Sequence, residues 1–135
     1  MFAATNVAAA LVKRPKFSGE YIFQVMNTLH IEQLPPEWES IAHVFSALGD
    51  VTRQKIILLF EPGEEIGLKA IVDCFPLSRT AVSHHVNTLE QAGMLVPTKR
   101  GREVFYTLNL ELAFSAMAQF KDYAKQMLAE VNGTP

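Results

Sequence analysis

Residues 67–108 contain two short helical stretches and a β-hairpin in immediate succession. Pro76 ends the first stretch, Ser78 is a good N-cap for the second, and Gly93 ends it. The residues that follow are β-prone on both sides of Gly101, as in two strands joined by a tight turn. Two helices joined by a short turn and followed by a hairpin are the order of a winged helix-turn-helix. We therefore predict a mainly α fold with a small β-hairpin.

The helix expected between Ser78 and about Ala92 is amphipathic. At 100° per residue its apolar side chains Val82, Val86 and Leu89 share one face, which we expect to be buried. Its first turn and outer face carry side chains that form hydrogen bonds and include no acid: Ser78, Arg79, Thr80, Ser83, His84 and Asn87. By itself this pattern also fits an ordinary surface helix. In a helix-turn-helix, however, the second helix enters the major groove, so these six residues are our candidate DNA contacts.

The expected hairpin has a basic tip. Lys99, Arg100 and Arg102 lie within four residues of one another, where they can reach phosphates or the minor groove of DNA. The net charge of the chain is −2, but residues 1–16 carry +3 and residues 76–106 carry +2. Because a small domain can bind phosphates through a local patch, this distribution is compatible with double-stranded DNA as the partner.

The rest of the chain is expected to be helical. We divide it into a flexible basic N-terminal arm, residues 1–16, and one domain, residues 17–131. Helical periodicity predicts further helices over residues 19–34, 37–48, 51–60 and 110–131, with Asp50 as an N-cap. The first and last of these have long apolar stripes, so we predict flanking N- and C-terminal dimerisation helices and a homodimer. The predicted interface residues are Tyr21, Val25, Met26, Leu29, Ala113, Met117, Phe120, Ala124 and Met127.

Membrane, secreted and enzymatic classes have little support in the sequence. No apolar run approaches the roughly 20 residues that span a bilayer, and a single cysteine, Cys74, cannot form an internal disulfide. We therefore expect a cytoplasmic protein without membrane contact. An enzyme, for instance a Cys/His hydrolase using Cys74, has no nucleophile elbow, phosphate-binding glycine loop or metal-ligand cluster to support it, so we predict no catalytic residues.

Three stretches of the chain together resemble the ArsR/SmtB family of bacterial winged helix-turn-helix repressors. They read FSALGDVTRQKIILLF, LSRTAVSHHVNTLEQAGML and KRGREVFYTLN, and the resemblance covers about residues 38–109. It implies a dimeric transcriptional repressor that binds a pseudo-palindromic operator. Two alternatives stay open: a winged-helix module that serves in protein–protein contact, and a redox-responsive regulator that uses Cys74.

The metal-sensing residues of that family are missing from this sequence. Many members carry a C-x-C pair before the helix-turn-helix, and the matching positions here hold Gly67 and Lys69. Other members bind zinc through Asp and His on the final helix, but no histidine follows His85. Because soft and borderline metals need thiolate or imidazole ligands, we predict neither a metal site nor a cofactor. The expected input is an unidentified small molecule between the first and final helices, or none.

Overall fold

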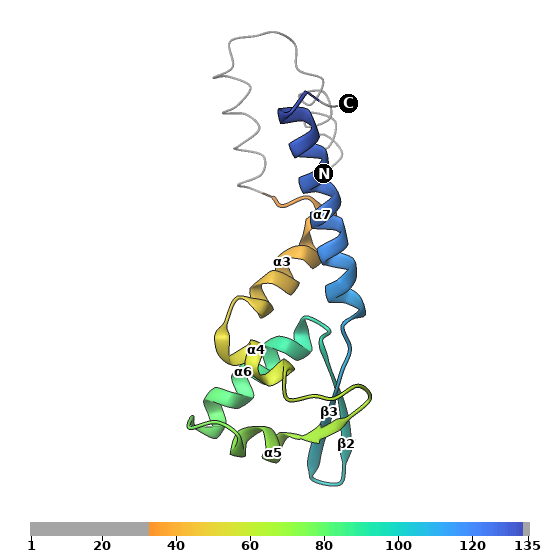
Figure 1. Ribbon diagram of the computed structural model, residues 1–135. Coiled ribbons are helices and arrows are strands. Elements are labelled where there is room, and N and C mark those ends of the chain that lie inside the picture. Colours follow the sequence, from red (N-terminus) through yellow and green to blue (C-terminus); the bar gives the residue numbers. More distant parts are fainter. Residues whose placement is uncertain (1–32, 134–135) are drawn as a thin grey trace. The chain divides into compact units, whose positions relative to one another are not determined.

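A computed structural model describes residues 33–133 (Figure 1). The chain divides into two units, residues 1–39 and residues 40–135; the core and site residues discussed below lie in the second. The helices and strands are α3 (Pro36–Leu48), α4 (Val51–Ile57), β1 (Glu65–Gly67), α5 (Leu68–Asp73), α6 (Arg79–Gln91), β2 (Leu95–Arg100), β3 (Glu103–Leu108) and α7 (Glu111–Val131). The predicted N-terminal arm and the predicted helix over residues 19–34 lie outside the described residues, except Gln33 and Leu34, which are not helical.

Side-chain caps fix the starts of α4 and α6. Asp50 accepts a hydrogen bond of 3.1 Å from the Arg53 amide, and Ser78 Oγ accepts one of 3.1 Å from the Ala81 amide. Each cap satisfies an amide that has no partner inside its helix. Gly93 follows α6 with φ +77°, a conformation that L side chains rarely adopt. Both predicted caps and the predicted end of α6 are confirmed.

The hairpin belongs to a three-stranded antiparallel sheet in the order β1-β3-β2. β2 pairs with β3 as far as Arg100 and Glu103, and β1 pairs with the other edge of β3. Two expectations are corrected here. Lys99 and Arg100 were expected between the strands, but β2 continues through Arg100, so only Gly101 and Arg102 form the turn. β1 has no counterpart in the sequence-based prediction.

Two helices are shorter than predicted. α4 ends at Ile57 instead of continuing to Phe60, because the next amides turn back to carbonyls three residues earlier: Leu59 donates to Ile56 and Phe60 donates to Ile57. α5 covers six residues instead of the predicted residues 67–75. Gly67 ends β1 and precedes the helix as its N-cap, and the amides of Cys74 and Phe75 donate to carbonyls three residues earlier.

The core lies between the inner face of α6, the sheet and the other helices. Val82, Val86 and Leu89 are at most 1% exposed, which confirms the predicted inward face. Burying side chains of this size contributes roughly 1.5–3 kcal/mol each. The neighbouring elements supply further buried apolar side chains, among them Val44, Ile56, Ile71, Leu95 and Tyr106. Because one face of α6 is anchored in this way, its opposite face is held toward solvent.

Helix α7 follows β3 and contributes to the core only near its start, through Ala113 and Ala116. Beyond these two residues it extends away from α4, α5 and α6 (Figure 1). Within residues 33–133, no helix has both the length and the hydropathy that crossing a bilayer requires.

Candidate nucleic-acid interface

The outer face of α6 carries the predicted contact residues into solvent. α6 packs against α4, α5 and β2, which leaves Arg79, Thr80, His84 and Asn87 exposed and Ser83 partly exposed. At 100° per residue these five positions fall on one side of the helix. The sixth predicted contact, Ser78, uses its hydroxyl to cap the helix. The structure therefore places five candidate side chains on one accessible surface beside the sheet.

The two-stranded hairpin β2–β3 and its turn, hereafter the wing, lies next to α6 through β2. Gly101 has φ +63°, which allows a tight turn of two residues. Lys99 and Arg100 end β2, Arg102 lies in the turn, and all three side chains are exposed. The basic tip predicted from the sequence is therefore present, but its three cations have different surroundings.

Arg100 is exposed but held against the sheet by contacts with the other two strands. Its guanidinium forms a two-pronged ion pair with the Glu65 carboxylate of β1, with N–O distances of 2.6 and 2.9 Å. It also lies over the ring of Phe105 on β3, 5.3 Å from the centroid. Paired guanidinium–carboxylate geometry of this kind is stronger than a single contact. The Arg100 side chain therefore reaches from β2 to β1 and has an acidic partner within the protein, which the sequence did not indicate.

Arg53 connects the α3–α4 corner to α6, a role that the sequence analysis missed. Its Nε donates to the Ala47 carbonyl (2.6 Å) and its Nη2 to the Ser46 carbonyl (2.9 Å), two acceptors at the end of α3. Its Nη1 donates to His85 Nδ1 on α6 (3.1 Å), since an arginine can only donate. His85 Nδ1 also lies 3.8 Å from Asp50 Oδ1. One side chain thus joins three helices.

Asp50 is the acidic member of this corner. The hydrogen bond from the Arg53 amide, together with the nearby His85 and the Arg53 guanidinium, holds the pKa of its carboxyl below the ordinary value of 3.8, although partial desolvation acts in the opposite direction. The carboxylate form therefore predominates at neutral pH, and it is this form that caps α4.

A second link joins α6 to the wing. Tyr106 on β3 is buried, and it lies near the carboxylate of Glu90 on α6. Burial raises the pKa of Tyr106 above 10.0, and the charge of Glu90 raises it further. The hydroxyl therefore remains protonated at neutral pH.

The positions that correspond to the family's cysteine pair have no liganding character here. A Cβ on Gly67 would lie 3.2 Å from the ring of Phe105, so this position packs against β3, and Lys69 is exposed. Cys74 is exposed, and its Sγ lies 3.2 Å from the Ala70 carbonyl. Across residues 33–133, no three His, Cys, Asp or Glu side chains gather into a group that could hold a metal ion.

The predicted interface residues of α7 differ in exposure. Met117, Phe120 and Met127 are 42–43% exposed and Ala124 is partly exposed, whereas Ala113 is 3% exposed and lies in the core of its own unit. Further apolar side chains on this helix are exposed as well: Leu112, Phe114, Leu128 and Val131. The exposed apolar surface of α7 therefore excludes Ala113, and Phe120 also packs edge-on against Phe45 of α3, with ring centroids 5.6 Å apart. The predicted interface residues Tyr21, Val25, Met26 and Leu29 lie outside the described residues.

Comparison with known proteins gives relatives for about half of the chain. No family profile matches it. The transcriptional repressor SdpR of Bacillus subtilis (strain 168) is 36% identical over 67 residues, which is 50% of this chain and 73% of SdpR.

Solved structures show the same fold. An ArsR-like transcriptional regulator from Rhodococcus sp. RHA1 matches with a TM-score of 0.62 and 23% identity, over 71% of this chain and 90% of that one. The homodimeric winged helix-turn-helix DNA-binding domain of a possible ArsR-family regulator from Mycobacterium bovis matches with a TM-score of 0.50 and 22% identity, over 68% and 84%. The winged helix-turn-helix fold predicted from the sequence is confirmed.

Proposed function

The chain belongs to the ArsR/SmtB family of winged helix-turn-helix transcriptional regulators, and on that premise we propose that it is a homodimeric repressor that binds a pseudo-palindromic operator in double-stranded DNA. One observation carries the proposal: the outermost positions of α6, Thr80, His84 and Asn87, are polar, exposed and free of acid, and the helix lies beside a basic wing. Glu90, the acid on α6, is partly exposed at the edge of this face, near Tyr106. The width of the major groove admits a helix with such a face.

Dimerisation is supported by α7. Large apolar side chains are exposed along the helix from Leu112 to Val131, and large exposed apolar patches mark interfaces. The related domain from Mycobacterium bovis is homodimeric. In a two-fold dimer, two copies of α6 about one DNA turn apart would contact two half-sites, which is why the operator should be pseudo-palindromic.

The input of this regulator is proposed not to be a metal ion. Gly67 and Lys69 replace the family's cysteine pair, and no histidine follows His85 in the sequence. A lysine at a would-be metal site also opposes a cation electrostatically. A redox input through Cys74 is the second candidate, favoured by the exposure of its thiol.

The test is DNA binding by the purified full chain. Fluorescence anisotropy with the DNA upstream of its own gene, against a scrambled fragment of equal length, should show preferential binding that weakens as salt rises. Equal affinity for both fragments at every salt concentration would contradict sequence-specific binding. No binding to either fragment would favour a protein–protein module.

A further inference from the structure

A small pocket lies where α5, the start of α6 and the tip of the wing meet. Its volume is about 230 Å³, below the roughly 300–1,000 Å³ of typical small-molecule sites, so it suits a small group. Residues from all three elements line it: Gly67, Leu68, Lys69, Arg79, Arg102, Glu103 and Val104.

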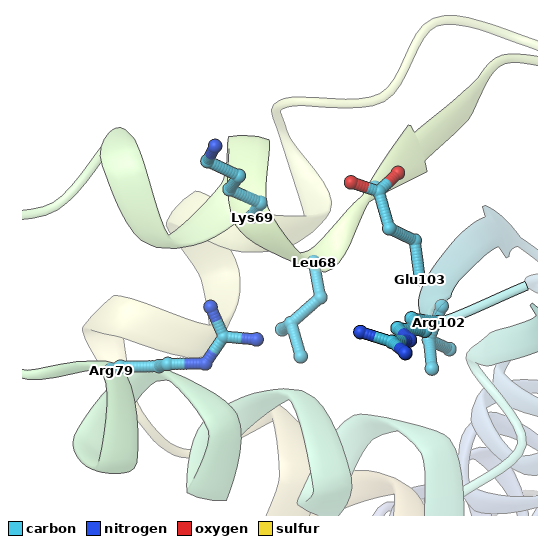
Figure 2. Close-up of a pocket in the computed structure, with 7 residues that line it drawn as sticks. Leu68, Lys69, Arg79, Arg102 and Glu103 are labelled. Carbon is cyan, nitrogen blue, oxygen red and sulfur yellow. The ribbon is translucent and has the colours of Figure 1, made fainter.

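The two arginines of the pocket converge on its centre. Figure 2 shows Arg79 and Arg102 extending toward Leu68 from opposite ends of the pocket, while the charged groups of Lys69 and Glu103 point away from Leu68. The centre is therefore lined by two guanidinium groups over an apolar side chain, and the carboxylate of Glu103 is directed elsewhere.

Pairing distinguishes these arginines from Arg100. Among residues 33–133, the ion pair formed by an arginine is that of Arg100 with Glu65, so neither Arg79 nor Arg102 has an acidic partner there. Two like charges facing one space repel each other, and an anion between them converts that repulsion into attraction. Guanidinium groups match the oxygens of a phosphate and hold it by paired hydrogen bonds.

We propose that Arg79 and Arg102 bind the same backbone phosphate of the DNA in this pocket, and that Arg100 supports the wing instead of binding that phosphate. The inference rests on the proposed function, because the ligand is a phosphodiester of the operator. It assigns different roles to two wing arginines that are two positions apart. A shared phosphate would also fix the wing tip against the start of α6, so that the two DNA-contacting elements engage together.

Alanine variants test whether the two arginines act on one phosphate. Arg79→Ala and Arg102→Ala should each weaken operator binding roughly 10-fold, as expected for charged hydrogen bonds. The double variant should lose clearly less than the product of the two single losses, because groups that share a partner are not additive. For the double variant, the slope of log affinity against log salt concentration should be shallower than that of wild type by about 0.9, the value for one phosphate. Fully additive losses would overturn the shared site.

Operator DNA with one phosphodiester at a time replaced by an uncharged methylphosphonate locates the contact. For wild type, the replacement should weaken binding at one position in each half-site. At that same position the replacement should not affect binding by Arg79→Ala or by Arg102→Ala. Arg100→Ala, the matched control from the same wing, should keep that sensitivity. The proposal is wrong if the two pocket variants lose sensitivity at different positions, or if Arg100→Ala loses it at the same position.

Two further arms separate other outcomes. If wild type binds no operator DNA, both the proposed function and the assignment of the pocket to a DNA phosphate are wrong. If both pocket variants bind the operator normally, only the assignment of the pocket is wrong. Inorganic phosphate, titrated at constant ionic strength, should leave operator affinity nearly unchanged. Strong competition by phosphate that depends on Arg79, without any methylphosphonate effect, would identify a free-phosphate site instead. Thermal melts of each variant check that it is folded.

Discussion

Replacing Arg53 with alanine removes three side-chain hydrogen bonds at the corner between α3 and α4. The bond to the Ser46 carbonyl is exposed, so water can replace it at little cost. The bonds to the Ala47 carbonyl and to His85 are partly buried, and an unsatisfied polar group there costs about 1–3 kcal/mol. We therefore expect Arg53→Ala to lower the free energy of unfolding by about 2–3 kcal/mol.

Gln54→Ala is the matched control for this substitution. Gln54 Nε2 donates one exposed hydrogen bond of 2.7 Å to the Leu48 carbonyl, at the same helix end. Its loss should cost about 0.5–1 kcal/mol. Urea denaturation followed by circular dichroism gives both free energies on one scale. Equal destabilisation by the two variants would refute the reasoning that Arg53 joins α3 to α6.

A double-mutant cycle separates the His85 contact from the contacts to α3. If Arg53 and His85 interact as the structure shows, the Arg53→Ala/His85→Ala variant should be more stable than the sum of the single losses predicts. Operator affinity of His85→Ala, measured under conditions where it is fully folded, reports whether the link also positions α6.

Four further predictions concern pH, assembly, recognition and signal. The pKa of Asp50 is lowered in the folded state, so its contribution to stability is present above pH 3.8 and is lost as pH falls below that value. The difference in unfolding free energy between wild type and Asp50→Asn should therefore shrink in acid. A difference that does not depend on pH would contradict this. Phe120→Glu should shift sedimentation from dimer to monomer, whereas a monomeric wild type at micromolar concentration would exclude the proposed assembly. His84→Ala or Asn87→Ala should cost roughly 1–3 kcal/mol in operator binding and less on scrambled DNA; unchanged operator affinity in both would mean that the assigned face is wrong. Operator affinity should change less than tenfold, about 1.4 kcal/mol, on addition of zinc, cadmium, arsenite or a thiol oxidant. A larger effect of a metal would refute the proposed absence of metal sensing. An oxidant effect that is lost in Cys74→Ser would establish a redox switch.

Local signals made α6 predictable from the sequence. Ser78, Gly93 and the spacing of Val82, Val86 and Leu89 all act within one helix, and the structure confirms them. The end of α4 was harder to place, because Leu58 and Leu59 continue the apolar pattern beyond the last helical residue while the backbone tightens into a turn. The apolar pattern therefore predicted that a helix is present better than it predicted the residue at which the helix ends.

Features that depend on distant parts of the chain could not be predicted. β1 is three residues long, too short for an alternating pattern, and forms through pairing with β3. Arg53 and His85 are 32 positions apart, and nothing local marks them as partners. Arg100 and Arg102 look equivalent in the sequence, but Glu65 and Phe105, which are distant from Arg100 in the sequence or on another strand, give Arg100 different surroundings. The polar face of α6 was thus predictable, but the roles of single cations beside it were not.

The ion pair between Arg100 and Glu65 constrains how this wing can be exchanged in protein engineering. The two residues are 35 positions apart, on opposite sides of the helix-turn-helix in the sequence. A chimera that takes residues 95–108 from a relative but keeps Glu65 leaves a carboxylate without its partner wherever the new wing lacks an arginine at position 100. Wing transplants should therefore exchange positions 65 and 100 as a pair, and natural variation at one of them should be accompanied by variation at the other.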